Sequence, residues 1–267
     1  MGKVEQVCLT PIGKVHADFH ETNKVPITGG QAFVEIFPEY LPALQRIEEN
    51  SHLWLLMWFH EADRDLLRTV PGRVNKNLPE YGVFALRAYK RPNPIGLTLV
   101  SLKEVVENGL IVEGLDAIDG TPVLDIKPYY EQDIVFSPRT SYIRAADYEM
   151  RRTLFFNEAL AHHQEICPFL YLAVRMALVA DELMGQITKE DLNVTVRGSR
   201  CLGDTLQGLT HARLANPPRF TFIESNEVQQ STWKNRERSL TISARRYDLD
   251  EHAFLHLTDD QLFELGE

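Results

Sequence analysis

A short loop in the first half of the chain, Arg91–Gly96 (Arg-Pro-Asn-Pro-Ile-Gly), carries a guanidinium and a carboxamide beside two prolines. Each proline fixes its own φ and pushes the residue before it toward extended backbone, so Arg91 and Asn93 have little freedom to lose when a ligand binds. The loop is therefore suited to form a preorganised edge for a polar ligand. The same composition is also typical of a plain proline-rich turn, and spacing alone does not separate the two interpretations.

A second group of reactive side chains, His163, Cys167 and Cys201, lies in the second half of the chain. His163 and Cys167 are four residues apart, so one helical turn would place both on one face, and Cys201 falls at the start of an expected helix, where a thiolate is favoured. These ligands suit zinc and leave an open position that Glu165 or a substrate thiol could fill. His162 is a further candidate. The alternative is two buried, inert cysteines and a surface histidine.

Composition limits the classes of protein to which the chain can belong. Its 267 residues are 44% hydrophobic, as expected for a globular protein, and the formal net charge of -10 argues against a broad basic surface for nucleic acid. A local basic patch is still compatible with this net charge. Three cysteines and no charged, apolar leader predict a cytoplasmic protein without a disulfide framework. The longest apolar run, Leu53–Phe59, fits a buried strand rather than a membrane span.

The first half of the chain reads as short strands separated by turn residues, which predicts a small all-β barrel over residues 1–135. One short amphipathic helix is expected at Leu41–Asn50 and an exposed excursion at Arg64–Pro79. The expected strands are Val4–His16, Gln31–Phe37, His52–His60, Gly82–Arg87, Leu97–Val106, Leu110–Leu115 and Val123–Ile126. Of these, His52–His60 is apolar on both faces and is expected to be central.

The pattern changes after Tyr130, where Glu131–Ala146 reads as a polar connection. Helices and strands then mix, which predicts an α+β domain over residues 147–267. The expected helices are Asp147–His162, Cys167–Met184, Leu202–Leu209 and Thr258–Leu265. The expected strands are Leu192–Val196, Arg219–Glu224, Gln229–Trp233 and Leu240–Arg245.

Four motifs of the first half together resemble the TsaA-like, or TrmO, family of S-adenosylmethionine-dependent methyltransferases. In order they are Ser51–His60, Gly82–Arg87, Arg91–Gly96 and Asp116–Tyr129. The resemblance implies a compact β-barrel, usually a homodimer, that binds S-adenosylmethionine near the Arg-Pro-Asn-Pro-Ile-Gly loop and the Asp-Gly-Thr-Pro segment. Several members of the family methylate a modified adenosine beside the tRNA anticodon, so tRNA is one expected acceptor.

The resemblance also implies which residues bind the cofactor. They are His52, Arg87, Arg91, Pro92, Asn93, Pro94, Ile95, Gly96, Leu97, Asp119, Gly120 and Thr121. Trp54, Trp58 and Phe84 are candidates for apolar walls around the adenine, with core packing as the alternative. Asp119 and Asp125 are the candidate catalytic residues, either as a base or by orienting the loop. For Asp125 the alternative is a structural salt bridge with Lys127.

The second half resembles a different family, the one named after the E component of formylmethanofuran dehydrogenase. The resemblance lies in His163–Pro168, Tyr171–Ala177 and Ser199–Thr210, and it implies metal binding. That family usually reads His-Gly-His-x-Cys-Pro-Gly at the first motif, whereas this chain has Gln164, Glu165 and Phe169 at the central Gly, the second His and the final Gly.

Together these features predict an S-adenosylmethionine-dependent methyltransferase whose acceptor is a small-molecule thiol presented by a metal site in the second domain, with zinc as the candidate ion. One alternative is a tRNA adenosine N-methyltransferase, which the first resemblance favours and the net charge disfavours. An alternative from another class is an accessory protein that binds metal and S-adenosylmethionine without turnover.

Overall fold

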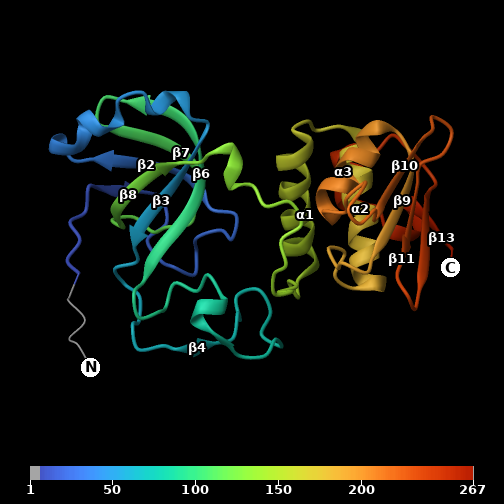
Figure 1. Ribbon diagram of the computed structural model, residues 1–267, viewed down its shortest axis with the longest axis horizontal. Helices are drawn as coiled ribbons and strands as arrows, with labels where there is room; N and C mark the ends of the chain where they lie inside the picture. The colour runs from blue at the N-terminus through green and yellow to red at the C-terminus, as the bar shows by residue number, and fades with distance from the viewer. Residues whose placement is uncertain (1–6, 267) are drawn as a thin grey trace. The chain divides into compact units, whose positions relative to one another are not determined.

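The structure, a computed structural model, describes residues 7–266 and divides into two compact units (Figure 1). The first unit comprises Met1–Pro71 and Leu78–Val135, and the second comprises Gly72–Asn77 and Phe136–Glu267. The sequence does not predict that Gly72–Asn77, part of the expected exposed excursion, belongs with the second unit. Within residues 7–266, no helix has both the length and the apolar character needed to cross a membrane.

Six strands of the first unit form a closed barrel in the order β1-β2-β7-β6-β3-β8, with every neighbouring pair antiparallel. The strands are β1 Gly13–His16, β2 Gly30–Ile36, β3 His52–Trp58, β6 Ile95–Val106, β7 Gly109–Leu115 and β8 Pro122–Pro128. Their inward side chains, mostly Val, Leu and Ile, fill the barrel. The predicted all-β barrel is confirmed. The Val4–Gln6 part of the first expected strand lies outside the described residues.

β3 shows why a run of apolar residues does not establish burial on both faces. Leu53, Leu55 and Met57 point into the barrel and are fully buried. The alternate residues, Trp54 and Trp58 among them, face outward and are only partly buried. The apolar run thus gives a buried strand with one partly covered face, because a small barrel buries the inner face of a strand and leaves the outer face of β3 incompletely covered by the described residues of this unit.

Two other local predictions for the first unit were wrong. The expected helix at Leu41–Asn50 is replaced by two short 3₁₀ helices, η1 Pro38–Leu44 and η2 Ile47–Glu49, because Pro42 cannot donate a helical hydrogen bond. The expected strand Gly82–Arg87 is a two-residue strand, β5 Tyr81–Gly82, followed by the 3₁₀ turn η3 Val83–Ala85. Among the described strands, β5 pairs only with β4, Arg68–Thr69.

The second unit is built on a five-stranded sheet in the order β10-β9-β11-β12-β13, parallel only between β10 and β9. Its strands are β9 Asn193–Gly198, β10 Phe220–Glu224, β11 Gln230–Lys234, β12 Ser239–Ala244 and β13 Phe263–Gly266. The helices are α1 Tyr148–His163, α2 Pro168–Met184, α3 Arg200–Thr210, α4 Glu251–His256 and α5 Asp259–Leu262. A short 3₁₀ turn, η4 Glu131–Asp133, ends the first unit. The predicted α+β class is confirmed.

Figure 1 shows α1, α2 and α3 on one side of the sheet, with α1 beyond α2 and α3. α2 is the central element, since every residue from Leu170 to Asp181 is buried. Near the C-terminus the expected helix Thr258–Leu265 was wrong in its second half, because Phe263–Gly266 pairs with β12 instead. α4 was not predicted.

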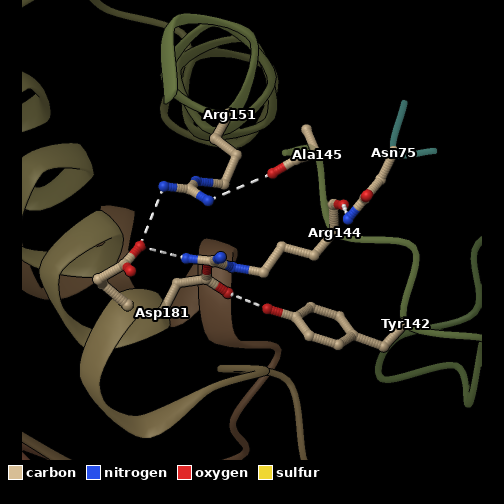
Figure 2. A network of polar contacts seen from close by, with 7 residues as sticks. Asn75, Tyr142, Arg144, Ala145, Arg151 and Asp181 are labelled. Carbon is tan, nitrogen blue, oxygen red and sulfur yellow. Dashed lines mark hydrogen bonds and ion pairs between the residues drawn. The ribbon is translucent and has the colours of Figure 1, made fainter. Parts of the chain in front are cut away.

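A polar network holds the segment that enters the second unit against α2 (Figure 2). The buried Asp181 carboxylate accepts hydrogen bonds from Tyr142 Oη and Arg144 Nε, each at 2.6 Å. Burial, and then the bond to Asp181, raise the pKa of Tyr142 far above its usual value. Asn75 Nδ2 donates to the Arg144 carbonyl at 3.2 Å, so Gly72–Asn77 is fastened to the same segment.

Candidate functional site

The end of β3 at Trp58 gathers two of the predicted cofactor-binding segments. Trp58 pairs with Ile95 at the start of β6, and Met57 pairs with Val123 near the start of β8. The loops that precede these strands, Arg91–Pro94 and Asp119–Thr121, therefore lie at the same end of the barrel. The fold thus brings together the two motifs that the sequence analysis assigned to S-adenosylmethionine binding.

His52 lies at the other end of β3. It pairs with Ser101, and its ring nitrogens are 2.9 Å from Ser51 Oγ and 3.2 Å from Ser101 Oγ. Six strand steps separate His52 from Trp58, a distance of about 20 Å. Within one chain, the structure does not bring this predicted cofactor residue to the others.

The Arg91 guanidinium shapes its own loop. Nε donates to the Ala88 carbonyl at 2.7 Å, and Nη2 donates to the carbonyls of Val83 at 2.9 Å and Leu86 at 2.5 Å. These carbonyls are thereby withdrawn from strand pairing, which explains why the expected strand at Gly82–Arg87 does not form. Arg91 therefore shapes the edge of the loop. These hydrogen bonds account for its position without a contact to S-adenosylmethionine.

The rest of the Arg-Pro-Asn-Pro-Ile-Gly motif divides into buried and exposed positions. The Pro94 carbonyl accepts from Phe59 N at 2.8 Å, and a Cβ at Gly96 would lie 2.5 Å from Phe59 Cζ, so both positions serve close packing. Pro92 is partly buried. The residues of the motif and its flanks that reach the surface are Arg87, Asn93, Ile95 and Leu97.

Asp119 lines a cleft on the barrel with a volume of about 540 Å³. Its Oδ1 accepts from Ala17 N at 3.2 Å, and its carboxylate oxygens are 4.0 Å from His16 Nδ1 and 3.9 Å from His20 Nδ1. Gly120 has φ of +76°, a conformation that glycine adopts without strain. Thr121 is buried and donates to the Ile118 carbonyl at 2.8 Å.

His16 is one of the cleft residues that sequence reasoning missed. Its Nε2 lies 2.7 Å from Glu35 Oε2, and its ring stacks on Phe33 with centroids 5.5 Å apart. The signal was present, since His16 ends the first strand and Glu35 lies on the next, but nothing in the sequence shows their pairing. The cleft is lined by His16, Ala17, Asp18, His20, Gln31, Ala32, Phe33, Ile111 and Asp119.

The other candidates on the barrel lie in different surroundings. Asp125 forms an ion pair with Lys127 at 2.7 Å, and its Oδ1 accepts from Ile126 N. This is the salt bridge that the sequence offered as the alternative to a catalytic role. Phe84, proposed as an adenine wall, is 80% exposed, whereas Trp58 is partly covered by the Arg64 guanidinium.

In the second unit, one donor atom from each of His163, Cys167 and Cys201 lies within 4.8 Å of the other two. His163 Nε2 is 3.6 Å from Cys167 Sγ. The spacing predicted that these two residues share one helical turn, and this prediction was wrong. α1 ends at His163, Gln164 adopts a left-handed conformation, and Cys167 begins α2 as its N-cap. The turn between two helices, rather than one helix face, brings them together.

Both thiols lie at helix N-termini. Cys167 Sγ accepts from Leu170 N at 3.4 Å, and Cys201 is the second residue of α3. A helix start favours a thiolate, but burial, and then the neighbouring Cys167, raise the pKa of Cys201. The two effects oppose each other at Cys201, and a metal ion bound by this sulfur would displace the thiol proton.

The donor set fits a borderline metal ion. Two sulfurs and one imidazole nitrogen are the ligands that zinc prefers, and ligands about 2.0–2.3 Å from a tetrahedral ion lie roughly 3.3–3.8 Å from one another. The 3.6 Å separation of His163 Nε2 and Cys167 Sγ meets this requirement. Three protein ligands leave one position for an exogenous group.

The residues beside the cluster include one that the sequence did not single out, Asp204. Its two carboxylate oxygens meet two adjacent histidines, Oδ2 at 2.7 Å from His163 Nδ1 and Oδ1 at 3.2 Å from His162 Nε2. The available signal was its spacing of three from Cys201 on an expected helix, which places both on one face.

The fold and these clusters define the class of the chain: a closed antiparallel barrel followed by an α+β unit that carries a Cys/His group. Residues 14–133 match the model of the tRNA-methyltransferase O N-terminal domain, and residues 162–258 match the family described as "FmdE, Molybdenum formylmethanofuran dehydrogenase operon". The chain belongs to the family of the tRNA-methyltransferase O N-terminal domain.

Three curated relatives give the extent of the likeness. A probable S-adenosyl-L-methionine-binding protein of Archaeoglobus fulgidus is 37% identical over 79% of this chain and 60% of its own length. One of Methanothermobacter thermautotrophicus is 45% identical over 47% of this chain and 92% of its own length. The Escherichia coli tRNA (adenine(37)-N6)-methyltransferase is 47% identical over 33% of this chain and 39% of its own length.

The chain thus spans 60% of the length of the Archaeoglobus fulgidus relative. A solved structure, titled "Crystal structure of TrmO", is 24% identical and covers 92% of this chain and 96% of its own, with a TM-score of 0.45. That TM-score is too low to bear on function.

Proposed function

We propose that this protein is an S-adenosylmethionine-dependent methyltransferase whose donor binds at the Trp58 end of the barrel. The observation that carries the proposal is the meeting of the Arg91–Pro94 and Asp119–Thr121 loops at that end, in a family whose relatives are named for binding S-adenosylmethionine. Asn93 at the exposed loop edge and Asp119 in the cleft are the polar groups suited to hold the donor.

Methyl transfer needs the acceptor atom in line with the bond between the donor sulfur and its methyl carbon. As the new bond to the methyl carbon forms, the bonding pair of the old one stays on the sulfur and neutralises the sulfonium. A nitrogen or thiol acceptor also loses a proton. Asp119 is placed to orient the reactants or receive this proton, and Asp125, already paired with Lys127, is less suited to it.

For the acceptor we favour a small-molecule thiol. His163, Cys167 and Cys201 would hold a zinc ion, and the chemistry that the ion supplies is a lower pKa for a bound thiol. Glu165, in the turn between α1 and α2, is the residue of this chain that we expect to compete for the remaining position. The net charge of -10 also favours a small acceptor over a polyanion.

A specific observation favours a second acceptor. The family model that matches residues 14–133 is that of a tRNA methyltransferase, and the Escherichia coli relative is named for adenine methylation in tRNA. A tRNA adenosine is therefore the alternative acceptor. It needs a local basic patch on an acidic protein, and no broad basic surface is implied.

One experiment separates these functions. The full-length protein is incubated with S-adenosylmethionine labelled on its methyl group, and transfer is measured to total tRNA and, in parallel, to a panel of small thiols with and without zinc. Zinc-dependent label in a thiol supports the favoured function, and label in tRNA supports the alternative. Donor binding by calorimetry with no transfer to either would leave an accessory, donor-binding protein.

We also propose that the barrel assembles as a homodimer through the outer face of β3 and β6. Ile95, Leu97 and Leu99 are 38%, 48% and 36% exposed on that face, beside the partly exposed Trp54 and Trp58. A contiguous apolar face of this kind is typical of an interface. Light scattering on wild type and Leu97→Glu tests it: a dimer that becomes monomeric supports the assignment, and a monomeric wild type overturns it.

A further inference from the structure

Asp204 lies next to the Cys/His group without being one of its three metal-binding residues. We propose that Asp204 is the positioning residue of this group: its carboxylate holds the His163 ring so that Nδ1 carries the proton and Nε2 presents its lone pair to the ion. The role toward the ion rests on the metal site proposed above.

The burial of His163 makes its orientation matter. Its side chain is only 9% exposed, so both ring nitrogens need partners inside the protein. Asp204 Oδ2, at 2.7 Å, occupies the Nδ1 side, and an ionised carboxylate can only accept. Nδ1 must therefore donate, which leaves Nε2 as the acceptor that faces Cys167 Sγ at 3.6 Å.

The Asp204 carboxylate does not require the two histidines as hydrogen-bond partners. Its side chain is 49% exposed, so water could solvate the carboxylate, and exposed ion pairs contribute little to stability. Yet its second oxygen is taken by His162, whose ring lies against Gly208: a Cβ at Gly208 would be 2.5 Å from His162 Cγ. The carboxylate is thus fixed from both sides, in the arrangement by which outer carboxylates orient metal-binding histidines.

α3 provides the means of this coupling. Cys201 and Asp204 are three residues apart on the same helix and share a face, so one rigid element presents both a ligand and the group that orients the ligand from α1. A shift of α3 would move both together.

The test compares the full-length wild type with Asp204→Asn by zinc titration against a chromophoric competitor. An amide can donate as well as accept, so it no longer enforces one tautomer, and zinc affinity is expected to fall by about 10–100-fold. The matched control is Glu224→Gln, which removes an exposed carboxylate paired with Arg200 at the start of the same helix, and its affinity is expected to stay within about twofold of wild type. Asp204→Glu, which keeps the charge, should recover part of the lost affinity.

A second measurement does not depend on metal. Nitrogen-15 NMR of the His163 ring in the metal-free protein, at a pH well above the ordinary histidine pKa of about 6.5, should show the proton on Nδ1 in wild type and a tautomer mixture in Asp204→Asn. A wild-type proton on Nε2, or unchanged zinc affinity in Asp204→Asn, overturns the proposal. Wild type that binds no zinc but carries the proton on Nδ1 overturns the metal site and leaves the ring orientation standing.

Discussion

The barrel motifs and the Cys/His group of the second unit use their residues in opposite ways. In the barrel, Arg91 and Gly96 serve largely local structure: the guanidinium binds three carbonyls of its own loop, and the glycine makes room for the Phe59 ring. In the second unit, His163 and Cys167 come from one segment of the sequence and Cys201 from another, and their donor atoms lie within 4.8 Å of one another.

The difference teaches how to weigh a motif. A long, specific motif such as Arg91–Gly96 identifies a fold because its residues build a particular loop, and only part of it remains free for a ligand. A sparse pattern such as His163, Cys167 and Cys201 carries little information about fold, but each residue can serve chemistry directly. Substitutions in the barrel motif should therefore affect stability together with donor binding, whereas those in the Cys/His group should affect metal binding alone.

The largest effect is expected at Arg91. Arg91→Met removes the donors to the Val83, Leu86 and Ala88 carbonyls, so the metal-free protein should lose about 3 kcal/mol of unfolding free energy. The affinity for S-adenosylmethionine should fall as well, because the loop loses its shape. Urea denaturation and calorimetric titration with S-adenosylmethionine measure the two effects. The control for stability is Arg87→Met, which changes an exposed arginine nearby. A variant that loses donor affinity at full stability would show that Arg91 contacts the donor instead.

Metal removal comes next, through linkage. If the Cys/His group binds zinc only in the folded state, zinc at 100 times its dissociation constant should raise the wild-type unfolding free energy by about 2.7 kcal/mol. Cys167→Ser should abolish this gain and change the stability of the metal-free protein by less than about 1 kcal/mol, since serine also caps a helix start. Thermal denaturation with zinc and with a chelator measures both. The same substitution at the exposed Cys8 should leave the zinc effect intact.

Gly96 gives a smaller effect, confined to the barrel. Gly96→Ala places a methyl group 2.5 Å from Phe59 Cζ, and the resulting overpacking is expected to cost about 2 kcal/mol. Gly82→Ala is the matched control, because a Cβ there meets no atom within 4 Å, and it should change stability by less than about 0.5 kcal/mol. Chemical denaturation of both variants gives the comparison. Equal stability of the two would mean that Phe59 moves aside freely.

The fold class was predictable because it depends on patterns that act locally. Alternating strands such as Leu110–Leu115 and periodic helices such as Asp147–His162 appear close to their expected positions, as β7 and α1. The failures have long-range causes. Gly82–Arg87 alternates like a strand, but the side chain of Arg91 takes its carbonyls, and Phe263–Gly266 leaves its expected helix because β12 offers an edge.

The candidate sites were predictable only in part, for a related reason. Residue types singled out the Arg91–Gly96 loop, the family resemblance added Asp119–Thr121, and chain topology then brought the two loops to one end of the barrel. The pairing of strands and the packing of helices decide which distant side chains meet, and no linear pattern contains this information. His52 is carried to the far end of β3, His16 is joined to Glu35 across β1 and β2, and Asp204 meets two histidines of α1.

The smallest effect is expected at Asp125, where the two catalytic candidates can be separated. Asp125→Asn breaks a half-exposed pair with Lys127, so stability should fall by less than about 1 kcal/mol. Because that pairing occupies the carboxylate, transfer of labelled methyl should continue, whereas Asp119→Asn should reduce it without a comparable loss of stability. Lys127→Met is the control, since it breaks the same pair and keeps the carboxylate. If Asp125→Asn abolishes transfer while Lys127→Met does not, the carboxylate itself is needed, and the barrel motif would then hold a catalytic group within its structural framework.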